Sequence, residues 1–264
     1  MKRELKDKVV WITGASSGLG EALTYQLAKE GARLVISSNE NEKLAEVAKN
    51  TGLPANQILV MPISLENFDA EKTTQEVIAH FGGIDVLINN AGVLQKAFFE
   101  DTTESIERKI MEINYFASVK LTRAVHPYLK SSKGMVAVVA SLNGRVGAPF
   151  MSTYCASKFA TIGFFESLRY ELYKDKVQVL IVIPGFMNTN ITLNAWTGDG
   201  SAFGQNSITQ KIGMTVDVCA LQFTKAIKNN RRNLLIGRWE HLFPYISIMA
   251  PSFFFWMFRK MHKL

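Results

Sequence analysis

Short runs of consecutive apolar residues alternate along this chain with longer segments in which apolar residues recur every three or four positions. The short runs predict buried strands, and the periodic segments predict helices that turn one face to a core. Predicted strands span 9–13, 34–37, 58–63, 84–88, 135–140, 177–183 and 234–236. Predicted helices span 21–29, 43–49, 70–81, 103–125, 153–174 and 216–228. Such alternation is typical of the α/β class, so we expect a doubly wound parallel sheet with helices on both faces.

The composition fits one folded unit of this kind. The 264 residues are 47% hydrophobic and 20% charged, which suits a single domain with a sizeable core. We expect that domain to span 1–241 and to be followed by an apolar tail over 242–264. Two cysteines are too few for a disulfide framework, and the histidines show no metal-ligand spacing, so no metal site is expected. The first residues lack the apolar core of a signal peptide, so we expect an intracellular protein, either cytoplasmic or peripherally membrane-associated.

The formal net charge is +7, which adds a constraint on partners. A positive surface attracts an anionic cofactor, an anionic membrane or nucleic acid. No recognisable nucleic-acid-binding module is present in the sequence, so no nucleic-acid partner is expected.

Candidate chemistry is concentrated around the helix predicted over 153–174. Tyr154 and Lys158 stand four positions apart and therefore share one side of that helix, and Ser141 directly follows the strand predicted over 135–140. A free tyrosine has a pKa near 10, and a lysine about 4 Å away could stabilise its phenolate by up to about 4 kcal/mol. Tyr154 would then work as a general acid/base near neutral pH, with Ser141 holding a substrate oxygen. Taken alone, the Tyr/Lys spacing also fits an ordinary pair on a solvated helix face.

The turn over 13–20 contains three glycines, Gly14, Gly18 and Gly20. These let the backbone approach a ligand closely, and the helix that follows directs free N–H groups towards a phosphate. The same turn contains Gly-x-Ser-x-Gly, the pattern of a hydrolase nucleophile elbow with Ser16 as nucleophile. A hydrolase of this type requires an acid and a histidine later in the chain, for which Asp217 and His241 are the plausible pair. It also requires an oxyanion-hole loop after an earlier strand, and only the first predicted strand precedes Ser16.

Several motifs occur in order along the chain. They are Thr13-Gly14-x-x-x-Gly18-x-Gly20, Asn89-Asn90-Ala91-Gly92, Asn114, Ser141, Tyr154-x-x-x-Lys158 and Pro184-Gly185. Together they resemble the short-chain dehydrogenase/reductase family over nearly the whole length. The later part more loosely resembles members with an aromatic-rich tail that act on lipid-like substrates. The resemblance implies a Rossmann-type fold and an oxidoreductase that transfers a hydride between a nicotinamide cofactor and an apolar alcohol or carbonyl compound.

The resemblance also implies a role for individual residues. Tyr154 would be the acid/base, Lys158 would lower its pKa and bind the nicotinamide ribose, Ser141 would polarise the carbonyl, and Asn114 would hold a water for proton relay. Cofactor contacts are expected from Gly14, Ser16, Ser17, Gly18, Leu19, Gly20, Ser38, Asn39, Asn90, Ala91, Gly92, Tyr154, Lys158, Pro184, Gly185 and Thr189. The resemblance further implies an apolar small molecule as substrate, and assembly of the chain with copies of itself into a homodimer or homotetramer.

Two positions depart from the family pattern. Ser64 stands where an adenine-contacting aspartate is often found, and Ser38 stands where NAD enzymes carry an acid. Ser16, Ser38 and Asn39 can hydrogen-bond a phosphate, whereas Glu40 opposes one. We therefore expect NADP(H) to be favoured, with NAD(H) possible.

The tail is the last informative stretch. Residues 242–258 carry no charge, include Pro244 and Pro251, and are followed by Arg259 and Lys260. This run is shorter than the ~20 residues that cross a bilayer, and the prolines interrupt a helix. We expect packing on the domain or a partner subunit, or shallow insertion into a membrane surface. A dinucleotide-binding membrane-surface module with little turnover remains an alternative, although binding alone does not require Tyr154.

Overall fold

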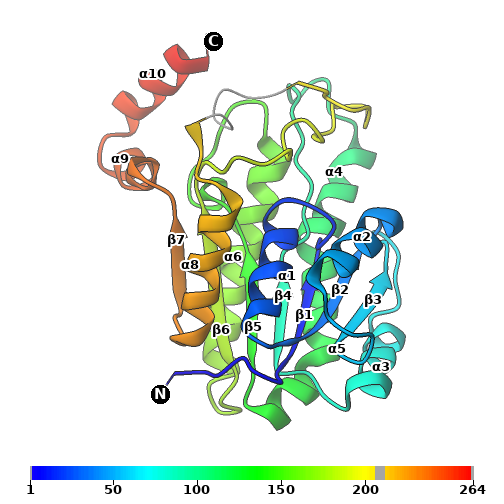
Figure 1. The fold of residues 1–264 in the computed structure, drawn as a ribbon. Coiled ribbons are helices and arrows are strands. Elements are labelled where there is room, and N and C mark those ends of the chain that lie inside the picture. Colours follow the sequence, from blue (N-terminus) through cyan, green and yellow to red (C-terminus); the bar gives the residue numbers. More distant parts are fainter. Residues whose placement is uncertain (1, 206–211, 263–264) are drawn as a thin grey trace.

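The computed structural model describes residues 2–205 and 212–262. Within them, seven strands form one parallel sheet in the order β3-β2-β1-β4-β5-β6-β7 (Figure 1). The strands are β1 (Val9–Thr13), β2 (Arg33–Ser38), β3 (Ile58–Pro62), β4 (Val86–Asn89), β5 (Met135–Val139), β6 (Gln178–Pro184) and β7 (Asn233–Ile236). The strand order reverses between β1 and β4, and a crevice for ligands opens at such a reversal, beyond the carboxyl ends of the strands. This confirms the predicted doubly wound parallel sheet.

Helices cover both faces of the sheet. One face carries α1 (Gly18–Lys29), α2 (Asn41–Thr51) and α8 (Val216–Lys228). The other carries α3 (Ala70–Phe81), α5 (Ala117–Ser132) and α6 (Ser152–Glu171). Strand residues alternate between the two layers, because successive side chains of a strand point to opposite faces. In β1, Val10 and Ile12 belong to the first layer, whereas Val9 and Trp11 belong to the second.

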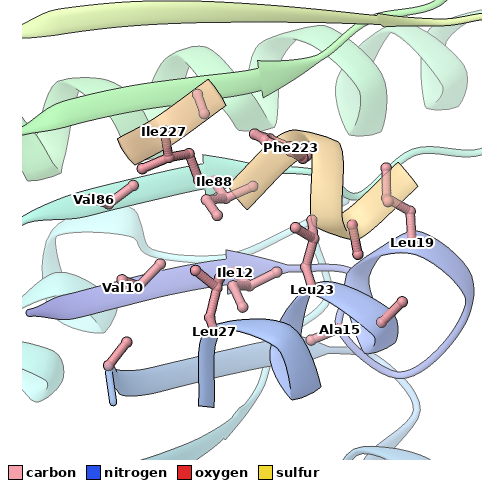
Figure 2. Packing of buried hydrophobic residues seen from close by; sticks show 14 of the residues in the cluster. Val10, Ile12, Ala15, Leu19, Leu23, Leu27, Val86, Ile88, Phe223 and Ile227 are labelled. Atoms are coloured by element: carbon pink, nitrogen blue, oxygen red, sulfur yellow. The ribbon is translucent and has the colours of Figure 1, made fainter. Parts of the chain in front are cut away.

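The first layer fixes where α1 lies. Figure 2 shows side chains of α1 and α8 converging on β1 and β4. Leu23 and Leu27 of α1 and Phe223 and Ile227 of α8 belong to one buried cluster with Val10, Ile12, Val86 and Ile88. All eight are at most 1% exposed. Burying one such side chain contributes roughly 1.5–3 kcal/mol, so this packing fixes α1, and with it the turn that precedes α1, against the sheet.

The helix predicted over 103–125 is interrupted. The structure has α4 (Glu104–Met111), a π-helical turn over Glu112–Phe116, and then α5. Periodicity could not predict this, because one extra residue in a helical turn leaves the apolar spacing on either side intact. The predicted end was also too early: α5 includes Pro127 and ends at Ser132, before Lys133 in a left-handed conformation.

The tail forms two short helices rather than one. They are α9 (Phe243–Met249) and α10 (Pro251–His262), with Ala250 between them. Pro244 and Pro251, expected to interrupt a helix, each lie at the start of one. At that position a backbone N–H has no intrahelical acceptor, so the N–H that proline lacks is not needed. Figure 1 shows α10 extending beyond the body of the domain, on the side of β7. Among the described residues, no helix has the length and apolar character needed to cross a membrane.

Candidate active site

The carboxyl ends of β1 and β4 are joined by side-chain hydrogen bonds. The Thr13 hydroxyl accepts from the backbone N–H groups of Asn90 and Ala91, both at 3.1 Å. In return, the Asn90 amide donates to the backbone oxygens of Thr13 at 2.9 Å and Gly14 at 3.1 Å. The two predicted motifs at these strand ends are therefore one rigid unit at the point where the strand order reverses.

Glycine is required in this unit by close backbone contact. A Cβ on Gly20 would lie 2.0 Å from the Gly14 oxygen and 2.6 Å from the Asn90 amide nitrogen. A Cβ on Gly14 would lie 2.8 Å from the Ala91 Cα, and Gly14 has φ +65°. Gly18, with φ +59°, is the first residue of α1 and lies near Thr189. The predicted glycine turn thus continues into the first turn of α1.

This turn fits the pyrophosphate of a dinucleotide. Ser17 caps α1 without a side-chain hydrogen bond, and the first N–H groups of an α-helix have no intrahelical acceptor. The N–H groups of Gly18, Leu19 and Gly20 belong to the first turn of this helix, at the β1–β4 crevice. A helix N-terminus provides N–H donors and the positive end of its dipole to a phosphate.

Hydroxyl groups and one acid meet at the end of β2. The Ser16 hydroxyl lies 2.8 Å from that of Ser38 and donates to the Glu40 carboxylate at 2.7 Å. Glu40 also pairs with Lys43, and that contact lowers the pKa of its carboxyl. Neither Asp217 nor His241 hydrogen-bonds Ser16 among the described residues, so the geometry gives the hydrolase alternative no base.

Ser141, Tyr154 and Lys158 come together as predicted from their spacing. Ser141 leaves β5 in an extended conformation, accepts from the Asn143 N–H at 3.1 Å, and lies close enough to Tyr154 to affect the pKa of its phenol. Tyr154 and Lys158 lie in α6 and are 7% and 4% exposed. The Lys158 ammonium donates to the Val139 carbonyl at 3.0 Å and lies 5.8 Å from the centre of the Tyr154 ring.

The expected effect of the lysine on the tyrosine is not found in this structure. Burial raises the pKa of Tyr154 to about 12, and the neighbouring Ser141 hydroxyl acts in the opposite direction. Burial also lowers the pKa of Lys158 to about 8. The charge of the lysine alone would lower the pKa of the tyrosine, but the loss of solvent outweighs it here. At pH 7 Tyr154 is therefore a neutral phenol with a proton to donate, and Lys158 is mainly cationic.

Asn114 lies in the π-helical turn and is 1% exposed. Its side-chain oxygen accepts from the Val93 N–H at 2.8 Å, and its amide donates to the Val93 carbonyl and the Ser157 hydroxyl, both at 3.0 Å. A Cβ on Gly92 would lie 3.2 Å from the Asn114 side-chain oxygen and 3.3 Å from the Lys158 nitrogen. The Gly92 backbone therefore lies beside both of these predicted site residues.

The turn after β6 depends on a residue that the sequence analysis missed. Glu240 is 3% exposed, and its carboxylate accepts from the Phe186 N–H at 3.1 Å. A Cβ on Gly185 would lie 2.4 Å from that same carboxylate oxygen. Pro184 and Gly185 are thus held from the side of β7. A single acid 54 positions away gives no local sequence signal, and only the adjacency of β6 and β7 brings it here.

Two apolar clusters flank the Ser141–Tyr154 pair. Leu94, Ala195 and Phe203 pack with Tyr154. Leu142, which follows Ser141, packs with Phe186 and the tail residues Phe243 and Phe254. The apolar residues around this pair therefore divide between a loop on one side and the tail on the other.

Fold and site together define a dinucleotide-binding oxidoreductase, and comparison with known proteins gives the family. Residues 8–199 match the family described as short chain dehydrogenase, so the chain belongs to that family and is an oxidoreductase that uses a nicotinamide cofactor. It is 36% identical over 260 residues to "Dehydrogenase/reductase SDR family member 7B" of Xenopus laevis, covering 95% of this chain and 80% of that one. It is also 36% identical to "Dehydrogenase/reductase SDR family member 7" of Homo sapiens, covering 98% of this chain and 79% of that one.

Solved structures agree on the fold. A short chain dehydrogenase from Burkholderia cenocepacia J2315 in complex with NADP is 25% identical, with a TM-score of 0.77 over 95% of this chain and 96% of that one. An SDR from Burkholderia phymatum in complex with NAD is 21% identical, with a TM-score of 0.78 over 94% of this chain and 92% of that one.

The glycine contact generates the first prediction. Gly20→Ala places a methyl group against the Gly14 carbonyl, so we expect it to lower the free energy of unfolding by roughly 1–3 kcal/mol and to abolish tight cofactor binding. Denaturant unfolding and fluorescence titration with NADPH and NADH measure the two effects.

Gly163→Ala is the matched control, because Gly163 also lies in a helix and a Cβ there meets nothing within 4 Å. Its free energy of unfolding should rise by about 0.5–1 kcal/mol, and it should bind cofactor normally. Normal cofactor binding by Gly20→Ala would contradict the assignment of this turn.

Proposed function

We propose that this enzyme interconverts an apolar alcohol and the corresponding ketone or aldehyde, with Tyr154 as the general acid/base. The observation that carries this proposal is that Ser141 and the buried Tyr154 and Lys158 come together at the carboxyl end of β5, beside the β1–β4 crevice. When bound, the nicotinamide cofactor supplies or accepts the hydride.

In the reducing direction, Tyr154 donates its proton to the substrate oxygen while Ser141 donates a hydrogen bond to the same oxygen. The neutral phenol at pH 7 suits this role, because a general acid must carry its proton. Lys158 stabilises the phenolate that remains and hydrogen-bonds the nicotinamide ribose. Its ammonium can leave the Val139 carbonyl for these partners without changing its place on α6.

Asn114 supports proton exchange from the π-helical turn, through a water held near Lys158. The remaining assigned residues form the cofactor site. Gly14, Ser16, Ser17, Gly18, Leu19 and Gly20 bind the pyrophosphate side; Ser38, Asn39, Asn90, Ala91 and Gly92 bind the adenosine side; and Pro184, Gly185 and Thr189 shape the nicotinamide end. A cofactor-binding module with little turnover would not need Ser141 and Tyr154 brought together beside Lys158, so we favour the enzyme.

For the cofactor, we propose a preference for NADP(H). Ser16 and Ser38 provide two hydroxyl groups at the end of β2, and Lys43 provides a positive charge there. All three can bind the 2′-phosphate of NADP. The Glu40 carboxylate, which now holds Ser16 and Lys43, opposes that phosphate and keeps the preference small.

For the tail, residues 242–264, we propose shallow insertion into an anionic membrane surface. Phe254 and Phe258 pack inward, whereas Phe253, Phe255 and Trp256 are 54%, 65% and 54% exposed. Basic residues Arg259 and Lys260 follow on α10. Exposed aromatic side chains beside basic ones favour the headgroup region of anionic bilayers. This makes the enzyme an intracellular, peripherally membrane-associated protein that takes its substrate from the lipid phase.

We also propose that the catalytic domain, residues 1–241, self-associates as a homodimer or homotetramer. Phe116 directly precedes α5, and Phe159 lies within α6. Both are 45% exposed and could be covered by a second copy.

Replacing the acid/base tests the proposed reaction. Tyr154→Phe removes the phenolic proton and keeps the ring, so we expect turnover of apolar ketones and alcohols to fall at least ~100-fold while cofactor binding is retained. A panel of such substrates, assayed with NADPH and NADH by nicotinamide absorbance, supplies the reference rates. Near-normal turnover in this variant would exclude the proposed role.

Ser16→Ala separates the hydrolase alternative from the oxidoreductase. If Ser16 only binds cofactor, turnover should stay within roughly tenfold of the wild type. Esterase activity that is present in the wild type and lost in Ser16→Ala would instead support a nucleophilic serine.

A charge change tests the cofactor preference. Glu40→Gln removes the carboxylate that faces Ser16 and pairs with Lys43, so NADPH should bind about fivefold tighter, with little change for NADH. Glu42→Gln, which removes an exposed acid from the first turn of α2, just after Glu40, is the control and should change neither affinity. Tighter binding of NADH than NADPH by the wild type would contradict the preference.

Replacing exposed aromatics tests the membrane proposal. A variant with Phe253, Phe255 and Trp256 changed to serine keeps the inward face of α10, and its binding to anionic phosphatidylserine vesicles should fall about tenfold or more in co-sedimentation. Deleting 242–264 should have at least the same effect.

The control changes Tyr170 and Tyr173 to serine, because these are 81% and 79% exposed but lie at and just beyond the carboxyl end of α6. It should bind vesicles as the wild type does. Equal binding by the tail variants and the wild type, or no binding by the wild type, would overturn the proposal. Light scattering on the same proteins reports whether the tail contributes to the oligomer instead.

A further inference from the structure

A cavity of about 660 Å³ lies beside the Tyr154 cluster. Aromatic rings form much of its wall: Phe98, Phe150 and Phe203 all line it. The rings of Phe98 and Phe150 meet edge to face at 4.8 Å. Phe150 has φ +66°, a left-handed conformation that is strained for an aromatic residue, and its carbonyl accepts from the Ala97 N–H at 3.0 Å. The fold therefore holds an apolar wall in place here at a cost in backbone energy.

Lys96 is the cationic residue of this cavity wall. It is partly buried, and its ammonium faces the ring of Phe203, 5.0 Å from the ring centre. Burial lowers the pKa of this ammonium. No carboxylate of the described residues lies within ion-pair distance of it. A half-buried cation that rests on an aromatic ring favours an anionic ligand, because the ring contact leaves its charge uncompensated.

Two acids also line the cavity, Asp101 and Asp199, but both are exposed to solvent. Asp199 accepts hydrogen bonds from Thr197 and Ser201, which hold its carboxylate within its own loop. Solvent screens exposed charges more strongly than half-buried ones. Among the charged residues that line the cavity, Lys96 is therefore the one least screened by solvent.

Phe203 connects this cavity to the reaction site. It lines the cavity and also packs in the cluster that contains Tyr154 and Leu94. Leu94 and Lys96 are anchored together, because the Leu94 carbonyl accepts from the Trp196 N–H and the Lys96 N–H donates to the Trp196 carbonyl, both at 2.8 Å. A substrate whose oxygen reaches Tyr154 can thus extend past Phe203 towards Lys96.

We propose that this cavity binds the far end of the substrate and that Lys96 pairs there with an acidic group. The preferred substrates are then amphipathic: an alcohol or ketone on an apolar skeleton that ends in a carboxylate. This inference rests on the proposed function for the reacting end and adds the chemistry of the remote end. The aromatic wall accommodates the skeleton, and the ammonium selects the charged terminus over a neutral one.

The test compares a long-chain oxo acid with its methyl ester, which differ only in the charge of the terminus. The wild type should show a KM for the acid about tenfold below that for the ester. In Lys96→Met the KM for the acid should rise about tenfold, with kcat nearly unchanged and the ester affected less than about twofold. Lys96→Arg should restore most of the preference for the acid, because it restores the charge.

Lys174→Met is the control for loss of one positive charge, because Lys174 is exposed and follows α6. It should leave both KM values unchanged. If Lys96→Met alters the acid and the ester equally, or alters neither, Lys96 does not select a carboxylate and the proposal is overturned.

A binding measurement separates this proposal from the proposed reaction. A fluorescent long-chain carboxylate should bind the wild type and Lys96→Arg, and should bind Lys96→Met about tenfold more weakly. If neither the acid nor the ester is turned over but this difference holds, the reacting-end proposal fails and the carboxylate site stands. If the probe binds all variants equally, the carboxylate site fails whatever the enzyme reduces.

Discussion

The site depends above all on one backbone contact, that between Gly14 and Gly20. With 2.0 Å between the Gly14 oxygen and the place where a Cβ on Gly20 would be, no other residue fits at position 20 without moving the turn. This contact brings the start of α1 onto the end of β1, and the Asn90 amide then joins both to β4. The cofactor cradle and the neighbouring strand end are therefore positioned by the same few atoms.

The sequence was sufficient for what local patterns encode. Alternating apolar runs predicted the sheet, because each strand is short, buried and bounded by a helix. The Tyr154/Lys158 spacing and the position of Ser141 after a strand predicted that these three residues meet. Thr13 and Asn90 stand at strand ends, where a parallel sheet brings distant segments together. These features follow from periodicity and topology alone.

What the sequence could not give depends on tertiary contacts. The high pKa of Tyr154 results from burial, which the residues flanking Tyr154 do not reveal. Glu240 supports Gly185 only because β6 and β7 are neighbours. The same holds for the tail: its inward face packs on Leu142, next to Ser141, and on Phe186, next to Gly185. Neither contact is encoded by spacing along the chain.

The π-helical turn over Glu112–Phe116 changes the helical phase between α4 and α5. Successive residues of an α-helix are rotated by about 100°, and a π turn accommodates one residue more than the α-helix it interrupts. Asn114 reaches Val93 and Ser157 from this turn while Leu121 and Val125 still face the core. Removing a single residue here would make the helix continuously α-helical but rotate the apolar stripe of α5 away from the sheet. A change of chain length between positions 112 and 116 should therefore disturb the core more than the same change in a surface loop.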